Sequence, residues 1–201
     1  MKQGLFLVVS APSGAGKSSI CQKLLRLCPK LDFSVSYTSR LPRPGEINGR
    51  DYHFVSRENF RKRVKRGEFV EWVENFGHLY GTSRRIMEKY QKRGGDLLLD
   101  VEPRGAKKIK KIFKEAVFVF VLPPTRADLM KRLKKRGHEN KDAIRARLAQ
   151  AESELKEISW YDYIIFNRDL DEAVQQLRSV YSAEKCRKEH LAAEIKKFMT
   201  K

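Results

Sequence analysis

The chain has 201 residues, 41% of them hydrophobic, which fits one sizeable core with a small inserted module better than two full domains. It carries 43 lysines and arginines against 25 acidic residues, and its net charge of +18 favours phosphorylated small molecules, nucleic acids or anionic surfaces as partners. The cysteine count is odd and the cysteines lack metal-ligand spacing, which indicates reduced thiols and a cytoplasmic protein. The first apolar run, at residues 5–9, is too short for a secretory signal or a membrane span.

The first predicted element is a buried strand over residues 5–9, and a loop of small residues separates it from a helical pattern. Glycines in such a loop let backbone N–H groups converge on an oligophosphate, the lysine reaches the terminal phosphates, and the next hydroxyl ligates Mg²⁺. The helix N-terminus adds a favourable dipole for an anion. A plain strand-to-helix turn is the alternative, but the strand–loop–helix setting favours a phosphate loop. The stretch comprises Ala11, Pro12, Ser13, Gly14, Ala15, Gly16, Lys17, Ser18 and Ser19.

Ala11 stands where the phosphate-loop pattern has its first glycine. An alanine requires only that this position has an ordinary backbone conformation. We therefore expect the substitution to be tolerated.

Residues 34–84 carry short strand-like pieces at 52–55 and 69–73 and a helix near 58–65, which predicts a small mixed module inserted into the core. Arg40 and Arg43 lie three apart in a loop braced by proline and glycine, and fixed arginine forks suit a phosphate dianion. Glu71 lies in an alternating run, where the residues alone favour a solvent-facing carboxylate.

Apolar runs at 97–101, 116–122 and 163–166 add three predicted strands, and helical patterns lie between them. This alternation predicts an α/β fold with a parallel central sheet flanked by helices. Residues 126–157 form two basic helical segments around a break at 137–140, which predicts a mobile flap. From Leu170 the spacing predicts one long helix with a charged, solvated tail over 185–201, and Trp72 and Trp160 are expected to be core anchors.

The run from Thr38 to Phe54, taken with the phosphate loop, closely resembles the signature of guanylate kinases, the P-loop kinases that phosphorylate GMP from ATP. The resemblance continues at 69–72, 79–82, 99–102, 132–137, 144–148 and 163–167, so it covers essentially the whole chain. It implies a P-loop kinase core formed by residues 1–33, 85–125 and 158–201. Residues 34–84 would be the GMP-binding module and 126–157 a helical lid.

The resemblance also implies site residues. The ATP site would contain loop residues 11–19 together with Arg136 and Asn167, and Arg147 would reach ATP from the lid. Ser18 would ligate Mg²⁺, with Asp100 as a second candidate. Arg104 stands where many members have glutamine, and its effect is open. The residues expected to assist transfer are Lys17, Arg40, Arg136 and Arg147, and those expected to bind GMP are Ser36, Arg40, Arg43, Tyr52, Glu71, Tyr80, Thr82 and Asp100.

The chemistry of GMP phosphorylation is consistent with these site residues. A nucleotide phosphate with a second pKa near 6 is mostly dianionic at pH 7, so no general base is needed and charge neutralisation is the main task. The carboxylate of Glu71 can accept both N1–H and N2–H₂ of guanine, a pair that adenine lacks. The expected reaction converts ATP and GMP, and also dGMP, to ADP and the nucleoside diphosphate.

Three other functions stay open at this point. A guanylate-kinase-like interaction module without catalysis is disfavoured because Lys17 and Ser18 are intact. A basic nucleic-acid-binding protein would account for the charge, and a sibling kinase would act on another phosphorylated acceptor. We expect no obligatory nucleic acid and no membrane partner, and the sequence leaves the oligomeric state undetermined.

Overall fold

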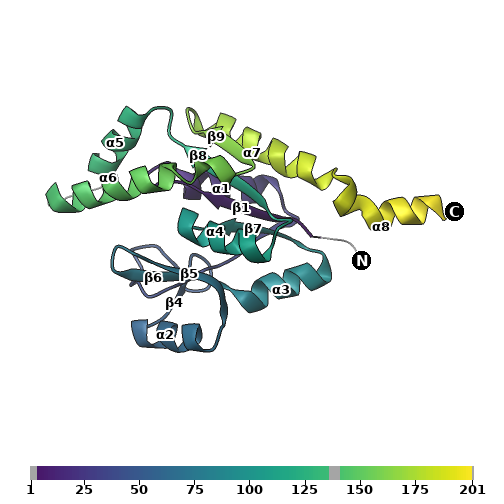
Figure 1. Ribbon diagram of the computed structural model, residues 1–201, viewed down its shortest axis with the longest axis horizontal. Helices are drawn as coiled ribbons and strands as arrows, with labels where there is room; N and C mark the ends of the chain where they lie inside the picture. The colour runs from purple at the N-terminus through teal and green to yellow at the C-terminus, as the bar shows by residue number, and fades with distance from the viewer. Residues whose placement is uncertain (1–3, 136–140, 201) are drawn as a thin grey trace.

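The computed structural model describes residues 4–135 and 141–200. Its centre is a five-stranded, fully parallel sheet in the order β2-β7-β1-β8-β9 (Figure 1). The α/β fold with a parallel central sheet is thus confirmed, and the structure adds the three-residue strand β2, which is too short to show a pattern in sequence. The strands are β1 Phe6–Ser10, β2 Leu31–Phe33, β7 Asp96–Asp100, β8 Val117–Leu122 and β9 Tyr163–Phe166.

Both faces of this sheet are covered by helices, which explains why its strands are continuous apolar runs. On one face, Leu7 and Val9 of β1 pack with α1 (Lys17–Leu27) and α7 (Leu170–Lys185). On the other face, Phe6 and Val8 pack with α3 (Arg84–Arg93) and α4 (Pro103–Ile112). In Figure 1, α7 lies above the sheet and α3 and α4 lie below it.

A second sheet of four strands, in the order β4-β3-β6-β5, lies below the central sheet (Figure 1). Helix α2 (Arg57–Lys65) covers one of its faces through Phe60, which packs with Phe69 and Leu79. The predicted strands and helix of this region are present, and β3 and β6 are additional. The strands are β3 Tyr37–Thr38, β4 His53–Phe54, β5 Phe69–Asn75 and β6 His78–Ser83.

Helices α5 (Arg126–Lys135) and α6 (Lys141–Leu155) pack on each other through Leu129 and Ala151. The predicted break at 137–140 lies outside the described residues. A short 3₁₀ helix, η1 (Ile158–Trp160), then leads into β9.

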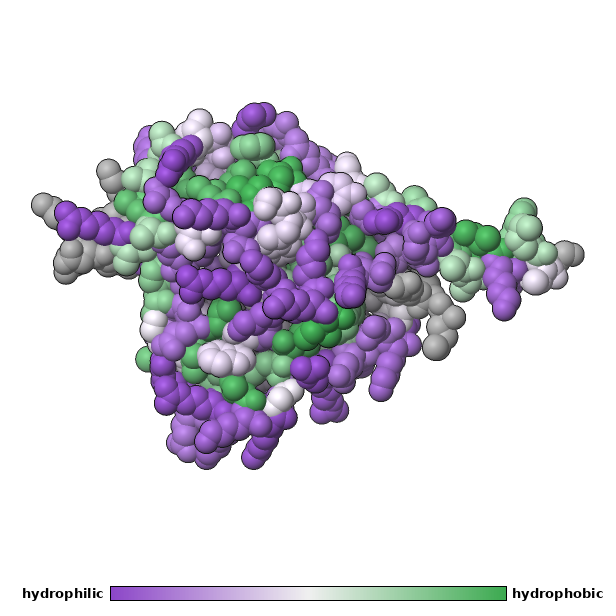
Figure 2. Space-filling view, in the orientation of Figure 1, coloured by the Kyte–Doolittle hydropathy of each residue, from purple (hydrophilic) through white to green (hydrophobic). Residues whose placement is uncertain are grey.

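The predicted helix from Leu170 is present as α7, and the charged segment after it is largely exposed, but the expectation that this segment is only a tail is wrong because it forms a further helix. Helix α7 ends at Lys185, Arg187 has an extended backbone (φ −64°, ψ 139°), and a second helix, α8 (Lys188–Met199), follows. Helix α8 projects from the body of the protein (Figure 1), and Figure 2 shows hydrophobic residues on the projecting part. Across the described residues, none of the helices, α8 included, is both long and apolar enough to span a bilayer.

Candidate active site

A cleft of about 1260 Å³ separates the phosphate loop from the four-stranded sheet. It brings together residues predicted for both nucleotides. Thr82 is hydrogen-bonded to Glu71, and Asn167, just after β9, is hydrogen-bonded to the phosphate loop. Arg136 lies outside the described residues. The predicted residues that line the cleft are Ser13, Lys17, Ser18, Ser36, Arg40, Arg43, Tyr52, Glu71, Tyr80, Asp100 and Arg147.

The phosphate loop connects the end of β1 at Ser10 to the start of α1 at Lys17. Gly14 and Gly16 have φ of +87° and +93°, a region that favours glycine. The Asn167 amide donates to the Ala15 carbonyl at 2.7 Å, and a Cβ added to Gly16 would lie 2.4 Å from its Nδ2 atom. Asn167 therefore supports the loop from the end of β9. Ala11 has no positive φ, so the ordinary backbone expected there is confirmed.

Lys17 is held at the head of α1 by oxygen atoms from the end of β7. Its Nζ lies 2.7 Å from Asp100 Oδ1 and donates to the Val101 carbonyl at 2.9 Å, and Glu102 Oε1 lies 4.0 Å away. Burial lowers the pKa of Lys17, but the carboxylates of Asp100 and Glu102 outweigh it, and the pKa is raised above its usual range. Lys17 therefore stays a cation. The role of Glu102 was missed in sequence, although its place just after a strand end was a signal.

Ser18 and Asp100 place two oxygen donors beside Lys17. Ser18 Oγ donates to Asp100 Oδ2 at 3.2 Å. The parallel register that pairs Val9 with Asp100 puts the carboxylate next to the loop. Mg²⁺ prefers oxygen ligands and binds one or two protein groups together with substrate phosphates and water. This donor set fits a magnesium ion that enters with a nucleotide.

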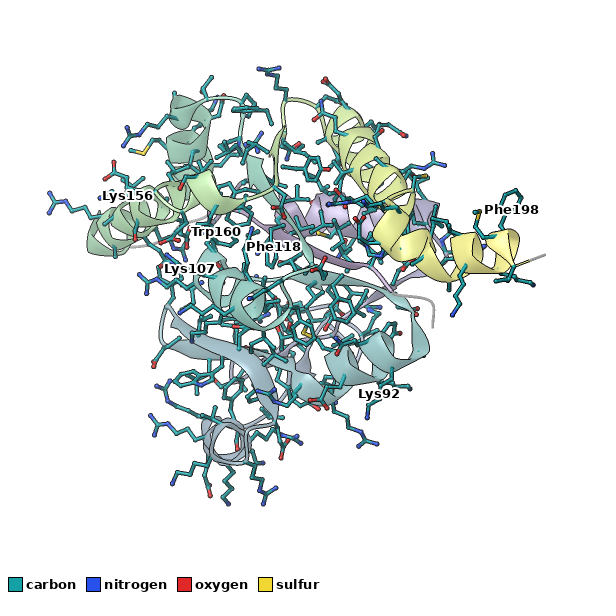
Figure 3. All side chains as sticks on the ribbon, turned by 45° about the vertical axis from the view of Figure 1, so that its right-hand side comes forward. Lys92, Lys107, Phe118, Lys156, Trp160 and Phe198 are labelled. Atoms are coloured by element: carbon teal, nitrogen blue, oxygen red, sulfur yellow. The ribbon has the colours of Figure 1, made fainter. Side chains whose placement is uncertain are left out.

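Glu71 points into the protein rather than into solvent, so the interpretation from the residues alone is wrong. A register shift in β5 between Phe69 and Glu71 sends these two side chains to opposite faces of the sheet, as β-bulges do near functional sites. Phe69 faces α2, and Glu71, only 5% exposed, faces the cleft. Trp72 is 39% exposed, so its prediction as a core anchor is wrong. Trp160 does pack edge-on against Phe118, with ring centroids 5.6 Å apart (Figure 3).

One carboxylate oxygen of Glu71 accepts a hydrogen bond and the other does not. Thr82 Oγ1 donates to Oε1 at 2.7 Å, whereas Oε2 is buried with no hydrogen-bond partner among the described residues. Burial raises the pKa of Glu71 to about 7, against a smaller lowering by the Thr82 hydrogen bond. An orphaned buried oxygen of this kind is costly unless a ligand donates to it.

Gly105 in the first turn of α4 packs directly against this carboxyl group. A Cβ added there would lie 2.5 Å from Glu71 Oε2 and 2.9 Å from its Cδ. Sequence reasoning did not assign Gly105 to the site. Its signal was a glycine inside the first turn of a helix, where a side chain would be favoured unless another group needed the space.

The arginine loop is braced by Glu46, which sequence reasoning also missed. Arg40 donates to both Glu46 oxygens, at 3.0 and 2.8 Å, and the Arg43 backbone N–H donates to Glu46 Oε2 at 2.7 Å. The hydrogen bond from Arg40 lowers the pKa of Glu46. The Arg40 guanidinium lies 5.5 Å from the centre of the Tyr52 ring, and the Tyr52 and Tyr80 rings are 5.9 Å apart. Two arginines and two phenols thus face one part of the cleft.

Helices α5 and α6 also contribute side chains near the cleft. Arg147 of α6 is half-buried and lines the cleft. Arg132 of α5 donates to the Ala15 carbonyl at 3.4 Å and so touches the phosphate loop, a contact with no separate signal in a run of basic residues.

Comparisons with known proteins agree with one another. The sequence profile of the family described as guanylate kinase matches residues 3–184. The chain is 49% identical over 193 residues to a guanylate kinase of Syntrophus aciditrophicus, covering 96% of this chain and 93% of the relative. It is 44% identical over 186 residues to one of Geobacter metallireducens, covering 92% of each.

Solved structures give the same result. The guanylate kinase from Anaplasma phagocytophilum superimposes with a TM-score of 0.78 at 32% identity over 97% of both chains. A shikimate kinase from Bacteroides thetaiotaomicron, at 15% identity, covers 89% of this chain and 98% of its own with a TM-score of 0.50. The second likeness shows the P-loop kinase fold alone.

Proposed function

The chain belongs to the guanylate kinase family, and we propose that its cleft phosphorylates GMP by direct, in-line transfer of the terminal phosphoryl group of ATP. The observation that carries this proposal is the position of Glu71. A buried carboxyl group with one unbonded oxygen opens into the same cleft as the phosphate-loop lysine. One cleft therefore offers a group that reads a base and a group that holds phosphates.

The donor half would hold ATP through the loop at residues 11–19. Its N–H groups and the N-terminus of α1 suit an oligophosphate, and the permanently charged Lys17 suits the transferring group. Ser18, with Asp100 beside it, would hold Mg²⁺. When bound, Mg²⁺ supplies positive charge that offsets the charge of the phosphates. Asn167 would act by fixing the loop rather than by chemistry.

The acceptor half would hold GMP between the arginine loop and β5. Arg40, Arg43, Tyr52 and Tyr80 would bind its phosphate, since they gather at one part of the cleft. Guanine would donate N1–H and N2–H₂ to Glu71, with Ser36 and Thr82 beside it. None of these proposed contacts reaches the ribose 2′-hydroxyl, so dGMP is expected to be accepted as well.

Transfer would then need positioning and charge neutralisation but no general base, because the GMP phosphate is already mostly dianionic at neutral pH. Lys17 and the lid arginines Arg136 and Arg147 would neutralise the transferring group. The division into core (1–33, 85–125, 158–201), GMP-binding module (34–84) and lid (126–157) is part of this proposal. The three free cysteines fit a reducing compartment, and we place the enzyme in the cytoplasm.

The test is a coupled ADP-release assay with ATP and Mg²⁺ against GMP, dGMP, AMP, CMP and UMP. GMP and dGMP are expected to turn over, and the other three by at least about 100-fold less, because a buried carboxylate would be left unpaired. Turnover of AMP equal to that of GMP would overturn the guanine assignment. No turnover with any acceptor would favour the interaction module.

A further inference from the structure

The tip of the β5–β6 hairpin has a bulky residue in an unfavourable backbone conformation. Phe76 and Gly77 form the two-residue turn between Asn75 and His78, with φ of +47° and +76°. Both central residues of such a turn need positive φ, and Asn-Gly is the favoured pair. Phe76 is the one non-glycine residue with positive φ in the described part of the chain. A phenylalanine at this position therefore needs a reason other than the turn.

The ring of Phe76 contacts the lid. The guanidinium carbon of Arg147 lies 5.1 Å from the ring centre, within the range of a cation–π contact. Phe76 is 44% exposed, so burial in a core does not explain it. Its ring and Arg147 both line the cleft.

A second contact joins the same hairpin to the same helix. Gln150 Nε2 donates to Asn75 Oδ1 at 3.0 Å and to Glu154 Oε1 at 2.8 Å. One amide group thus links the hairpin tip to a carboxyl group of its own helix that is 4% exposed. Gln150 follows Arg147 by three residues and so lies on the same face of α6.

The first strand of this hairpin, β5, also carries Glu71, the carboxyl group proposed to read the base. Glu71 precedes Asn75 by four residues in β5, and Val73 between them lines the cleft. A short, hydrogen-bonded strand thus connects the acceptor site to the lid helix that carries Arg147.

We propose that Phe76 and Asn75 are positioning residues that hold Arg147 of the lid against the phosphoryl group when the acceptor site is formed. The inference rests on the proposed function, because Arg147 is the residue that would touch the phosphates. Phe76 fixes the guanidinium through its ring face, and Asn75 fixes the helix through Gln150.

The first test replaces the ring without removing apolar bulk. Phe76→Leu is expected to lower kcat for GMP by about three- to fivefold, the size of an exposed cation–π contact, with KM for GMP changed less than about twofold. Phe76→Tyr keeps the ring face and is expected to retain the wild-type kcat. Phe198→Ala, at the far end of α8 (Figure 3), is the matched control and leaves kcat unchanged.

A second variant distinguishes the effect of losing the Phe76 ring from the effect of changing the turn conformation. Phe76→Asn supplies the residue that the turn favours, so Tm is expected to stay the same or rise while kcat falls as in Phe76→Leu. A merely structural role would instead leave kcat equal to wild type in this variant. Wild-type kcat in both Phe76→Leu and Phe76→Asn overturns the inference.

A double-mutant cycle tests whether Phe76 acts through Arg147. In an Arg147→Met background, Phe76→Leu is expected to cause no further loss of kcat, and a full additional loss contradicts the proposal. These outcomes are distinct from failure of the proposed function. If the wild-type protein does not phosphorylate GMP, the proposed function fails; if it does and the Phe76 variants match it, only the positioning role fails.

Discussion

The two ionisable groups at the centres of the two halves of the cleft, Lys17 and Glu71, lie in opposite environments. In the donor half, Lys17 is already paired with Asp100 at 2.7 Å and remains charged. In the acceptor half, Glu71 is buried and accepts one hydrogen bond from the neutral Thr82 hydroxyl, and its other oxygen has no hydrogen-bond partner among the described residues. Under the proposed function, Lys17 of the donor half would recognise the charge of the phosphates, whereas the part of the acceptor half around Glu71 would recognise the hydrogen-bond donors of the base. Substitutions in the first should change rate, and those in the second should change the choice of base.

The largest effect is expected for Lys17→Ala, which removes the cation of the donor half. We expect kcat to fall by at least about 100-fold, because the charge of the transferring group loses its neutralising partner. The ADP-release assay measures the loss, and a Tm within a few degrees of wild type shows that the fold survives. A kcat within tenfold of wild type would contradict the role given to Lys17.

Glu71→Gln is the matching change in the acceptor half. It replaces one acceptor oxygen by an N–H₂ donor, so kcat/KM for GMP is expected to fall by about 100-fold while that for AMP changes little. The measurement is the ratio of kcat/KM for the two acceptors. An unchanged preference for GMP rules out Glu71 as the base-reading group.

Two glycines sharpen the comparison, although alanine at Gly16 carries an added backbone strain because Gly16 has a φ of +93°. Gly105→Ala puts a Cβ 2.5 Å from Glu71 Oε2, and Gly16→Ala puts one 2.4 Å from Asn167 Nδ2. We expect the first to raise KM for GMP by about tenfold because it displaces Glu71, and the second to raise KM for ATP by a similar factor because it displaces Asn167 and so distorts the phosphate loop. Isothermal titration with each nucleotide measures whether Gly105→Ala weakens the binding of GMP and Gly16→Ala weakens the binding of ATP. If both variants weaken the same nucleotide, the two halves are not separate sites.

The pH dependence gives a smaller effect with a defined sign. Burial raises the pKa of Glu71 to about 7, so between about pH 4.5 and 7 the folded state retains a proton that the unfolded state releases. This group therefore makes the free energy of unfolding decrease as pH rises through that range, by about 1–3 kcal/mol. Urea unfolding at pH 5 and pH 8 should show the decrease in wild type and a smaller one in Glu71→Gln.

Burial also raises the pKa of Glu154 to about 7. Glu154→Gln is therefore the control that measures how much of the pH dependence of the free energy of unfolding comes from Glu154. In kinetics, kcat/KM for GMP should rise toward pH 7 as Glu71 ionises. The titration of the GMP phosphate itself, near pH 6, persists in Glu71→Gln. Identical profiles for the wild type and Glu71→Gln would mean that Glu71 is not the titrating group.

The smallest effect is expected for Arg104→Gln, which installs the residue that the family resemblance leads us to expect at this position. Arg104 is exposed at the start of α4, whereas its neighbour Gly105 is buried against Glu71. We expect kcat and both KM values to change less than about twofold, as for surface changes away from the site. A larger change would assign Arg104 a role in one of the two halves.

By itself, the sequence determined the features that depend on neighbours along the chain. The apolar runs predicted four strands of the central sheet, and small residues before Lys17 predicted the phosphate loop, because strand, turn and helix signals are local. The family resemblance named residues of both halves, and the cleft contains most of them. The spacing could not show the second C-terminal helix, since charged residues alone do not distinguish a solvated helix from a solvated tail.

Tertiary structure alone decided where the carboxylates point and what they contact. The register shift beside Glu71 arises from pairing with β6, so alternation in one strand could not reveal that this side chain turns inward. The contacts of Asp100 with Lys17 and of Gly105 with Glu71 join residues more than thirty positions apart. Such contacts depend on how strands and helices pack, and packing is not encoded in the spacing of any single segment.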